Sequence, residues 1–316
     1  MSNVQAFLNA RQVFRVGVVN EGSRNRYDVS FPRPTGGVGT ATFRDNVPSS
    51  FAVYKEGISY AGSPTASIEN LPPQAFAAAG LNATLTKALR LVSSHEAKFD
   101  GINSYDRAIF SFGFIQFAGG SVSAGQLPNM MMLFKTKQPQ MFHQLFGQYG
   151  IDVVAGSPRP DVRIWTENGT QVSGDDAWLY VMRNKQLTTA FIAAGNSPIC
   201  MAMQIEQAAV GYVFPALKMP LDLGALGRIP ASSILRSEAG NIALIDRTIN
   251  MGAGGAGRLF KEAIDALAPN GSLAQIQNLS DQRILQQVVA IGQARNDKRI
   301  VDRINSILNG GYSFAK

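Results

Sequence analysis

Residues 85–120, LTKALRLVSSHEAKFDGINSYDRAIFSFGFIQFAGG, decide the fold of this chain. The first part has apolar residues at positions i, i+3, i+4 and i+7, the spacing of one buried helical stripe: Leu85, Ala88, Leu89 and Val92. Glu96 takes the next position on that stripe, four residues past Val92. Burial at a helix end removes solvation from a carboxylate, and desolvation raises the pKa of a carboxyl group. A general acid that works near neutral pH needs such a shift, so Glu96 is a candidate acid.

A polar, turn-rich link follows the helix and leads into an apolar segment. Asp106 comes ten residues after Glu96, and Asp100 lies between them. We expect residues 109–117 to form one strand, in which Gly113 leaves room for another group to approach the backbone closely. One buried acid and one solvated carboxylate, separated by a turn, form the arrangement that glycoside hydrolysis uses.

The joint pattern resembles the lysozyme-like superfamily, and its specific part spans about 25 residues: Glu96, Phe99, Asp100, Asn103 and the run from Gly113 to Gln116. Members of that superfamily place a catalytic Glu at a helix end, before a β-hairpin with a Gly-x-x-Gln type pattern. The spacing to Asp106 is most similar to phage-type lysozymes. Gln204, Tyr212, Pro215 and residues 240–252 are loosely similar to the second lobe of bacterial chitosanases. Ala97 matches the small residue after the catalytic Glu, but Lys98 replaces a frequent Gly.

The resemblance implies an α+β fold. Residues 69–316 would form a mainly helical, two-lobed lysozyme-like domain that contains a short β-hairpin. It implies hydrolysis of the β-1,4 bonds of peptidoglycan or a related amino-sugar polymer, which is a muramidase activity. Glu96 would be the general acid and Asp106 the second carboxylate. The expected substrate-binding residues are Asp100, Tyr105, Gly113 and Gln116. We expect no cofactor and no metal site.

Other interpretations stay open. A lytic transglycosylase needs the Glu but no second carboxylate, and a chitosanase-like enzyme would prefer deacetylated polymer. A non-catalytic wall-binding or structural component of a phage or secretion-type particle would bind without turnover. Glu96 could also be an exposed helix-end acid, and Asp100 and Asp106 could be turn formers that bond their own backbone.

Residues 1–68 differ in texture from the rest of the chain. Short strand-like runs at 13–19, 27–31, 41–45 and 50–60 are separated by clusters of Gly, Pro, Asn and Ser. We expect a small β-rich module, joined by a linker at residues 62–73. Its role would be targeting, oligomerisation, or docking to a carrier, secretion machinery or phage particle.

Composition limits the classes of partner. The net charge of +7 favours polyanions, and anionic bacterial cell wall fits. The 29 Lys and Arg residues are scattered, so we do not expect nucleic acid. No apolar run of about 18 residues predicts a membrane span. Because the chain starts without a convincing secretory signal, we expect it to be made in the cytoplasm and to reach the wall by release or dedicated export.

Several other chemistries have little support. Cys200 is the sole cysteine, which excludes an intrachain disulfide and a cysteine-based zinc cluster, and two histidines exclude a three-His metal site. The formal GxGxxG at Gly252, Gly254 and Gly257 is expected to be an interhelical loop rather than a dinucleotide site. Asn168–Gly169 predicts a hairpin turn. Trp165 and Trp178 are candidates for stacking on a sugar, although buried Trp is more common.

Overall fold

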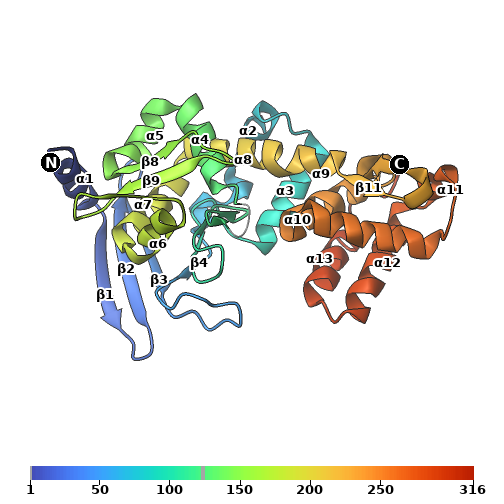
Figure 1. The fold of residues 1–316 in the computed structure, drawn as a ribbon, viewed down its shortest axis with the longest axis horizontal. Coiled ribbons are helices and arrows are strands. Elements are labelled where there is room, and N and C mark those ends of the chain that lie inside the picture. The colour runs from blue at the N-terminus through green and yellow to red at the C-terminus, as the bar shows by residue number, and fades with distance from the viewer. Residues whose placement is uncertain (1, 122–124) are drawn as a thin grey trace. The chain divides into compact units, whose positions relative to one another are not determined.

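Seven antiparallel strands form the main sheet, and they follow one another across it in chain order. They are β1 (Arg15–Asn20), β2 (Asn25–Pro32), β3 (Val38–Arg44), β4 (Ser59–Tyr60), β5 (Ile102–Asn103), β6 (Ser111–Phe112) and β7 (Phe117–Ala118). The computed structural model describes residues 2–121 and 125–316. The fold is α+β, with small antiparallel sheets and a helical bulk, and this confirms the predicted class (Figure 1).

The first three predicted strands are confirmed as β1, β2 and β3, whereas residues 50–60 contribute only β4. β4 pairs with β5, with Tyr60 opposite Ile102. Strands from residues 1–68 and strands from residues 102–118 therefore share one sheet. The structure has two compact units: unit 1 is Met1–Ala75 with Ser93–Gln207, and unit 2 is Phe76–Val92 with Ala208–Lys316. The expected boundary between residues 68 and 69 is therefore not where the structure divides.

The predicted strand at residues 109–117 is instead the hairpin β6–β7. The turn between its strands contains Gly113 at φ +91° and Gln116 at φ +55°. A left-handed backbone at two positions is incompatible with a continuous strand. The turn has the sequence Gly-Phe-Ile-Gln, which contains two large apolar residues, so the sequence did not predict a turn there.

Unit 1 contains a second sheet of β8 (Ile151–Val154), β9 (Asp161–Trp165) and β10 (Gln171–Ser173), and β9–β10 is the hairpin predicted at Asn168–Gly169. Its helices are α1 (Ser2–Arg11), α4 (Leu127–Lys137), α5 (Pro139–Leu145), α6 (Gly174–Arg183), α7 (Lys185–Gly195) and α8 (Pro198–Ala208), which ends at the first residue of unit 2. Short 3-10 turns are Pro64–Ala66, Ile68–Asn70 and Gly147–Tyr149. Helix α1 was not among the predicted elements, because its sequence separates apolar from polar side chains only weakly at the helical period.

Aromatic side chains form the core of unit 1 around Phe191. Phe110 and Phe112 approach the Phe191 ring with centroid distances of 4.9 and 5.3 Å. Trp178 is 1% exposed and stacks on Phe110 at 5.7 Å. Sugar stacking by Trp178 is therefore corrected to a core role.

Lys185, the first residue of α7, joins a loop and a helix end from a buried position. Its Nζ donates to the carbonyls of Glu56 at 2.7 Å and Met182 at 2.6 Å. It also lies over the Tyr27 ring, 5.3 Å from the centroid. Burial lowers the pKa of Lys185 to about 8, although the charges of Asp45 and Glu56 act in the opposite direction.

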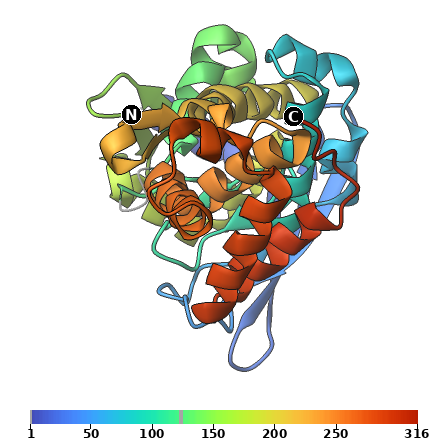
Figure 2. The same cartoon turned by 90° about the vertical axis from the view of Figure 1, so that its right-hand side faces the viewer.

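Unit 2 is mainly helical, and the ribbons of α12 and α13 lie side by side in both views (Figures 1 and 2). Its helices are most of α2 (Pro73–Ala78) and α3 (Ala83–His95), with α9 (Phe214–Lys218), α10 (Glu238–Leu267), α11 (Leu273–Asn278), α12 (Asp281–Ala294) and α13 (Lys298–Leu308). A two-stranded sheet, β11 (Pro220–Asp222) and β12 (Arg228–Pro230), accompanies a π-turn at Ala209–Val213 and 3-10 turns at Gly224–Leu226 and Ala231–Ser233.

The predicted stripe on α3 is confirmed, because its four apolar residues are at most 7% exposed: Leu85, Ala88, Leu89 and Val92. The helix begins with a side-chain cap, in which the Asn82 Oδ1 accepts from the Leu85 N–H at 3.0 Å.

The glycine motif lies inside α10 rather than in an interhelical loop. Gly252 has φ +71° and ψ 160°, and it kinks the helix. Gly254 and Gly257 are helical residues beyond the kink. A dinucleotide fingerprint needs a strand that leads directly into the glycine turn, and here a helix precedes the glycines. Within residues 2–121 and 125–316, none of the helices has the length and apolar character that crossing a bilayer requires.

A buried charge cluster joins α10 to α13. Asp246 is fully buried, and its Oδ2 accepts from Nε and Nη2 of Arg247 at 2.8 and 2.6 Å. The Arg303 Nε donates to Oδ1 at 3.1 Å. Asp246 is therefore a buried carboxylate shared by two arginines.

Asp246→Asn is expected to destabilise the protein by about 3–5 kcal/mol, because two buried guanidinium groups lose their shared carboxylate. Urea unfolding measures this change. Asp302→Asn, an exposed carboxylate on α13, is the matched control and should stay within about 0.5 kcal/mol of wild type. Equal effects of the two substitutions would contradict the structural role of Asp246.

Lys185→Met tests the buried lysine by pH. Between pH 8 and pH 10.5 the unfolded chain holds the lysine proton and the folded chain does not, so raising the pH disfavours unfolding. We expect the stability of wild type relative to Lys185→Met to rise by up to about 3 kcal/mol across this window. Unfolding curves for both proteins at the two pH values supply the comparison, and a constant difference would refute it.

Candidate functional site

Glu96 is the first residue after α3, so the predicted acid does stand at a helix end. Its N–H donates to the Ser93 carbonyl at 3.3 Å, and the residue is half-buried. The Ser93 Oγ donates to the Ala97 carbonyl at 2.9 Å, and this bond fixes the turn on both sides of Glu96. The backbone of Glu96 is thereby held in a short turn directly after the helix.

Asp100 is an anchor of the fold. Its Oδ1 accepts from the Ser63 N–H at 2.9 Å, and its Oδ2 accepts from the Asn196 Nδ2 at 3.0 Å and the Tyr60 hydroxyl at 3.4 Å. Burial raises the pKa of Asp100, and the bonds from Ser63 and Asn196 oppose that shift. Because Asp100 is 0% exposed, it cannot contact a substrate in this conformation. The expected substrate contact at Asp100 is therefore wrong.

Asp106 organises its own turn. Its Oδ1 accepts from the Ala108 N–H at 2.9 Å and its Oδ2 accepts from the Asn103 Nδ2 at 3.2 Å. The side chain is half-buried, so part of its surface still faces solvent. These bonds match the turn-forming interpretation, and they leave the predicted role as second carboxylate a prediction.

Tyr105 connects this turn to the loop that precedes β4. Its carbonyl accepts from the N–H groups of Val53 at 2.6 Å and Tyr54 at 3.0 Å. The same loop exposes Phe51, which is 63% exposed. This loop was predicted to belong to a separate module, and no local signal in the sequence places it beside Tyr105.

Gly113 is approached closely, as predicted, but by a side chain of the protein. A Cβ at Gly113 would lie 2.1 Å from the Gln204 Oε1. The buried Gln204 amide accepts from the Phe114 N–H at 3.2 Å and donates to the Phe99 carbonyl at 2.9 Å. Substrate contact at Gly113 is thereby corrected to close packing, and Gln204 is a positioning residue for the hairpin.

Gln116 closes the turn of the same hairpin. Its Nε2 donates to the Gly113 carbonyl at 2.9 Å. Its Oε1 is buried and has no hydrogen-bond partner among the residues that the structure describes. The residue is half-buried, so its predicted contact with substrate stays a prediction.

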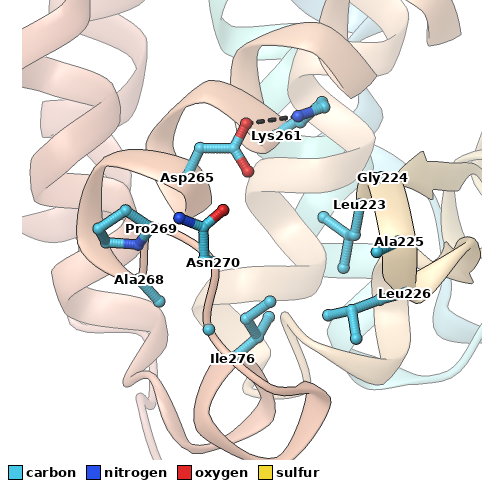
Figure 3. Close-up of a pocket in the computed structure, with 11 residues that line it drawn as sticks. Leu223, Gly224, Ala225, Leu226, Lys261, Asp265, Ala268, Pro269, Asn270 and Ile276 are labelled. Carbon is cyan, nitrogen blue, oxygen red and sulfur yellow. Dashed lines mark hydrogen bonds and ion pairs between the residues drawn. The ribbon is translucent and has the colours of Figure 1, made fainter.

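A cavity of about 460 Å³ lies elsewhere, in unit 2 (Figure 3). Leu223, Leu226 and Ile276 line it with apolar side chains, and the ion pair between Lys261 and Asp265 also lines it. Two cavities of about 410 and 250 Å³ lie in unit 1, the first beside Asn196 and the second beside Asp45. Across the described residues, none of these three cavities is lined by a predicted site residue.

The remaining candidates lie on one continuous segment of the chain in unit 1, residues 96–116. Glu96 directly follows α3, and the connections of the antiparallel meander β5–β6–β7 contain Tyr105, Asp106 and Gln116. The described residues contain no group of three His, Cys, Asp or Glu that could hold a metal ion. The chemistry that this segment can offer is acid–base chemistry by carboxylates.

Gly113→Ala is expected to destabilise the protein by about 2–4 kcal/mol, because the new methyl group strains a left-handed backbone and displaces the Gln204 amide. Gly169→Ala is the matched control: its φ is +76°, but nothing lies within 4 Å of its Cβ position. It should cost about 1 kcal/mol from backbone strain alone. Thermal or urea unfolding measures the difference, and equal costs would contradict the role of Gln204.

Comparison with protein-family models, with curated proteins and with solved structures gives no match. The resemblance to the lysozyme-like superfamily therefore depends on the motif residues themselves. Their placement on one helix end and one meander is the observation on which a functional proposal can be built.

Proposed function

We propose that the protein cleaves the β-1,4-glycosidic bonds of peptidoglycan with Glu96 as the general acid. The observation that carries this proposal is the half-buried Glu96 directly after α3, followed by the β5–β6–β7 meander. The C-terminal end of a helix disfavours a negative charge, because unpaired carbonyls point toward it. A general acid must carry its proton in order to donate it to the leaving glycosidic oxygen.

The net charge of the chain supports an anionic wall polymer as substrate. A chain of +7 is attracted to such a polymer at long range, and it is repelled by cationic chitosan. A chitosanase-like activity is therefore the weaker of the two glycosidase proposals. To meet the wall, the protein would be released from the cell or exported by a dedicated carrier.

In the hydrolytic mechanism, Asp106 would position a water molecule or stabilise the oxocarbenium-like transition state. Its two oxygens already accept bonds from Ala108 and Asn103, but each carboxylate oxygen has a second lone pair for a water. Glu96 would give its proton to the glycosidic oxygen, the C1–O4 bond would break, and water would supply the new C1 oxygen. The proton that this water loses would go to Asp106 as the base or, where Asp106 only stabilises the transition state, back to Glu96.

A lytic transglycosylase is the second candidate, because the two aspartates that follow Glu96 in the chain, Asp100 and Asp106, both accept hydrogen bonds from backbone N–H groups. Asp100 is fully buried and Asp106 organises a turn. In this mechanism Glu96 protonates the glycosidic oxygen and later accepts the proton of the C6 hydroxyl of muramic acid. That oxygen attacks C1, so a C1–O6 bond replaces the C1–O4 bond and no water is consumed.

Mass spectrometry of the soluble products from purified sacculi tests the proposal. Wild type should release muropeptides, and Glu96→Gln should reduce the rate by roughly 10²–10⁴-fold, because the amide cannot donate the required proton. Glu262→Gln, an exposed carboxylate in unit 2, is the matched control and should leave the rate unchanged.

The products and Asp106→Ala separate the mechanisms. Reducing-end muropeptides, with a loss of activity in Asp106→Ala, support the hydrolase. Anhydro products, with activity retained in Asp106→Ala, support the transglycosylase. Binding to sacculi without any product from wild type would refute both and leave a wall-binding or structural component of a phage or secretion-type particle.

A further inference from the structure

β1 is the terminal strand of the seven-stranded sheet, and β2 is its neighbour among the described strands. All of its residues are exposed except the half-buried Val16. Val18 is 59% exposed and Val19 is 41% exposed. Figure 1 shows β1 at the outer margin of the strands, beside β2. An exposed edge with apolar side chains is a template for pairing with another strand.

The hydrogen-bond pattern shows which backbone groups face the open side of β1. The Glu21 N–H donates to the Arg24 carbonyl at 2.9 Å, so this pair is hydrogen-bonded and the pairs alternate from there along the ladder. The register with β2 then directs the backbone of three residues to the open edge: Val16, Val18 and Asn20. A bond on the other side of β2 supports this alternation. The carbonyl of Asn25, the residue opposite Asn20, faces β3 and accepts from the Asp45 N–H at 3.2 Å.

β1 is complementary to a second copy of itself in one antiparallel register. Hydrogen-bonded pairing needs edge-facing residues opposite one another, and centring on Val18 places Val16 opposite Asn20. The same register places Arg15 opposite Glu21 at both ends, on one face of the sheet. Opposite charges directly across two strands stabilise the pairing. The Glu21 carboxylate also binds Arg44, Arg26 and Arg24 of its own chain, at 2.7, 3.3 and 3.8 Å, so it is only partly available to Arg15 of the second copy. Gly17 falls opposite Val19, so the exposed valine meets a residue without a side chain.

We infer that β1 is a dimerisation edge, through which two copies of this chain pair antiparallel with Val18 at the two-fold axis. The two sheets become continuous, and the edge-facing N–H and C=O groups of Val16, Val18 and Asn20 gain partners. The interface is one strand wide, so the dimer is weak and depends on protein concentration. This inference is independent of the proposed glycosidase activity.

Disulfide trapping detects such a weak dimer. Cys200 is fully buried, so an introduced cysteine is the thiol that an oxidant reaches. Across this register the two Val18 Cα atoms would be about 5.5 Å apart, which suits a disulfide. Val18→Cys should form linked dimers at least about tenfold faster than Val38→Cys, a 70% exposed position on β3 that serves as control. Equal rates overturn the inference.

Charge reversal in the Val18→Cys background tests the register. Arg15 has no ion pair among the described residues, so Arg15→Glu keeps the fold and puts two like-charged pairs across the edge. Trapping should slow roughly tenfold, because like charges across the edge repel each other. Arg33→Glu, also exposed in unit 1, should trap at the parent rate. An Arg15→Glu variant that traps as fast as its parent overturns the register.

Discussion

The buried amide of Gln204 is the interaction on which the predicted site depends. It satisfies the Phe99 carbonyl and the Phe114 N–H at once, and these groups lie on the link after Glu96 and on the hairpin turn. A buried backbone group without a partner costs about 1–3 kcal/mol. Gly113 is the position that permits the approach, because a Cβ there would overlap the amide oxygen. The hairpin and the segment after α3 are thereby fixed to α8 by one side chain.

Local patterns predicted much of the secondary structure. The α3 stripe has a single period, Asn82 caps it, and the Asn168–Gly169 turn has residues that tolerate a left-handed backbone. The strands of residues 13–45 alternate and are separated by turn residues, so they were also correct. The hairpin at 109–117 was missed because Gly113 was its sole turn signal within an apolar run.

The wrong boundary and the wrong substrate contacts share a physical cause. Pairing of β4 with β5 joins segments about forty residues apart, and no periodicity of either segment encodes that pairing. Asp100 is a residue type that is common in active sites, yet it is fully buried and accepts hydrogen bonds from Ser63 and Asn196. Burial of a polar residue by distant partners is a tertiary property, and the sequence gives no local indication of it.

Each unit is assembled from two stretches of chain, and this connectivity controls the order in which the units can be completed during synthesis. Phe76–Val92 belongs to unit 2, but it leaves the ribosome before most of unit 1 exists and about 115 residues before its own partners begin at Ala208. The apolar face of α3 therefore stays without its unit 2 partners while Ser93–Gln207 is made. A nascent chain released near residue 200 would carry an apolar helix without its core, which is a natural binding site for a chaperone.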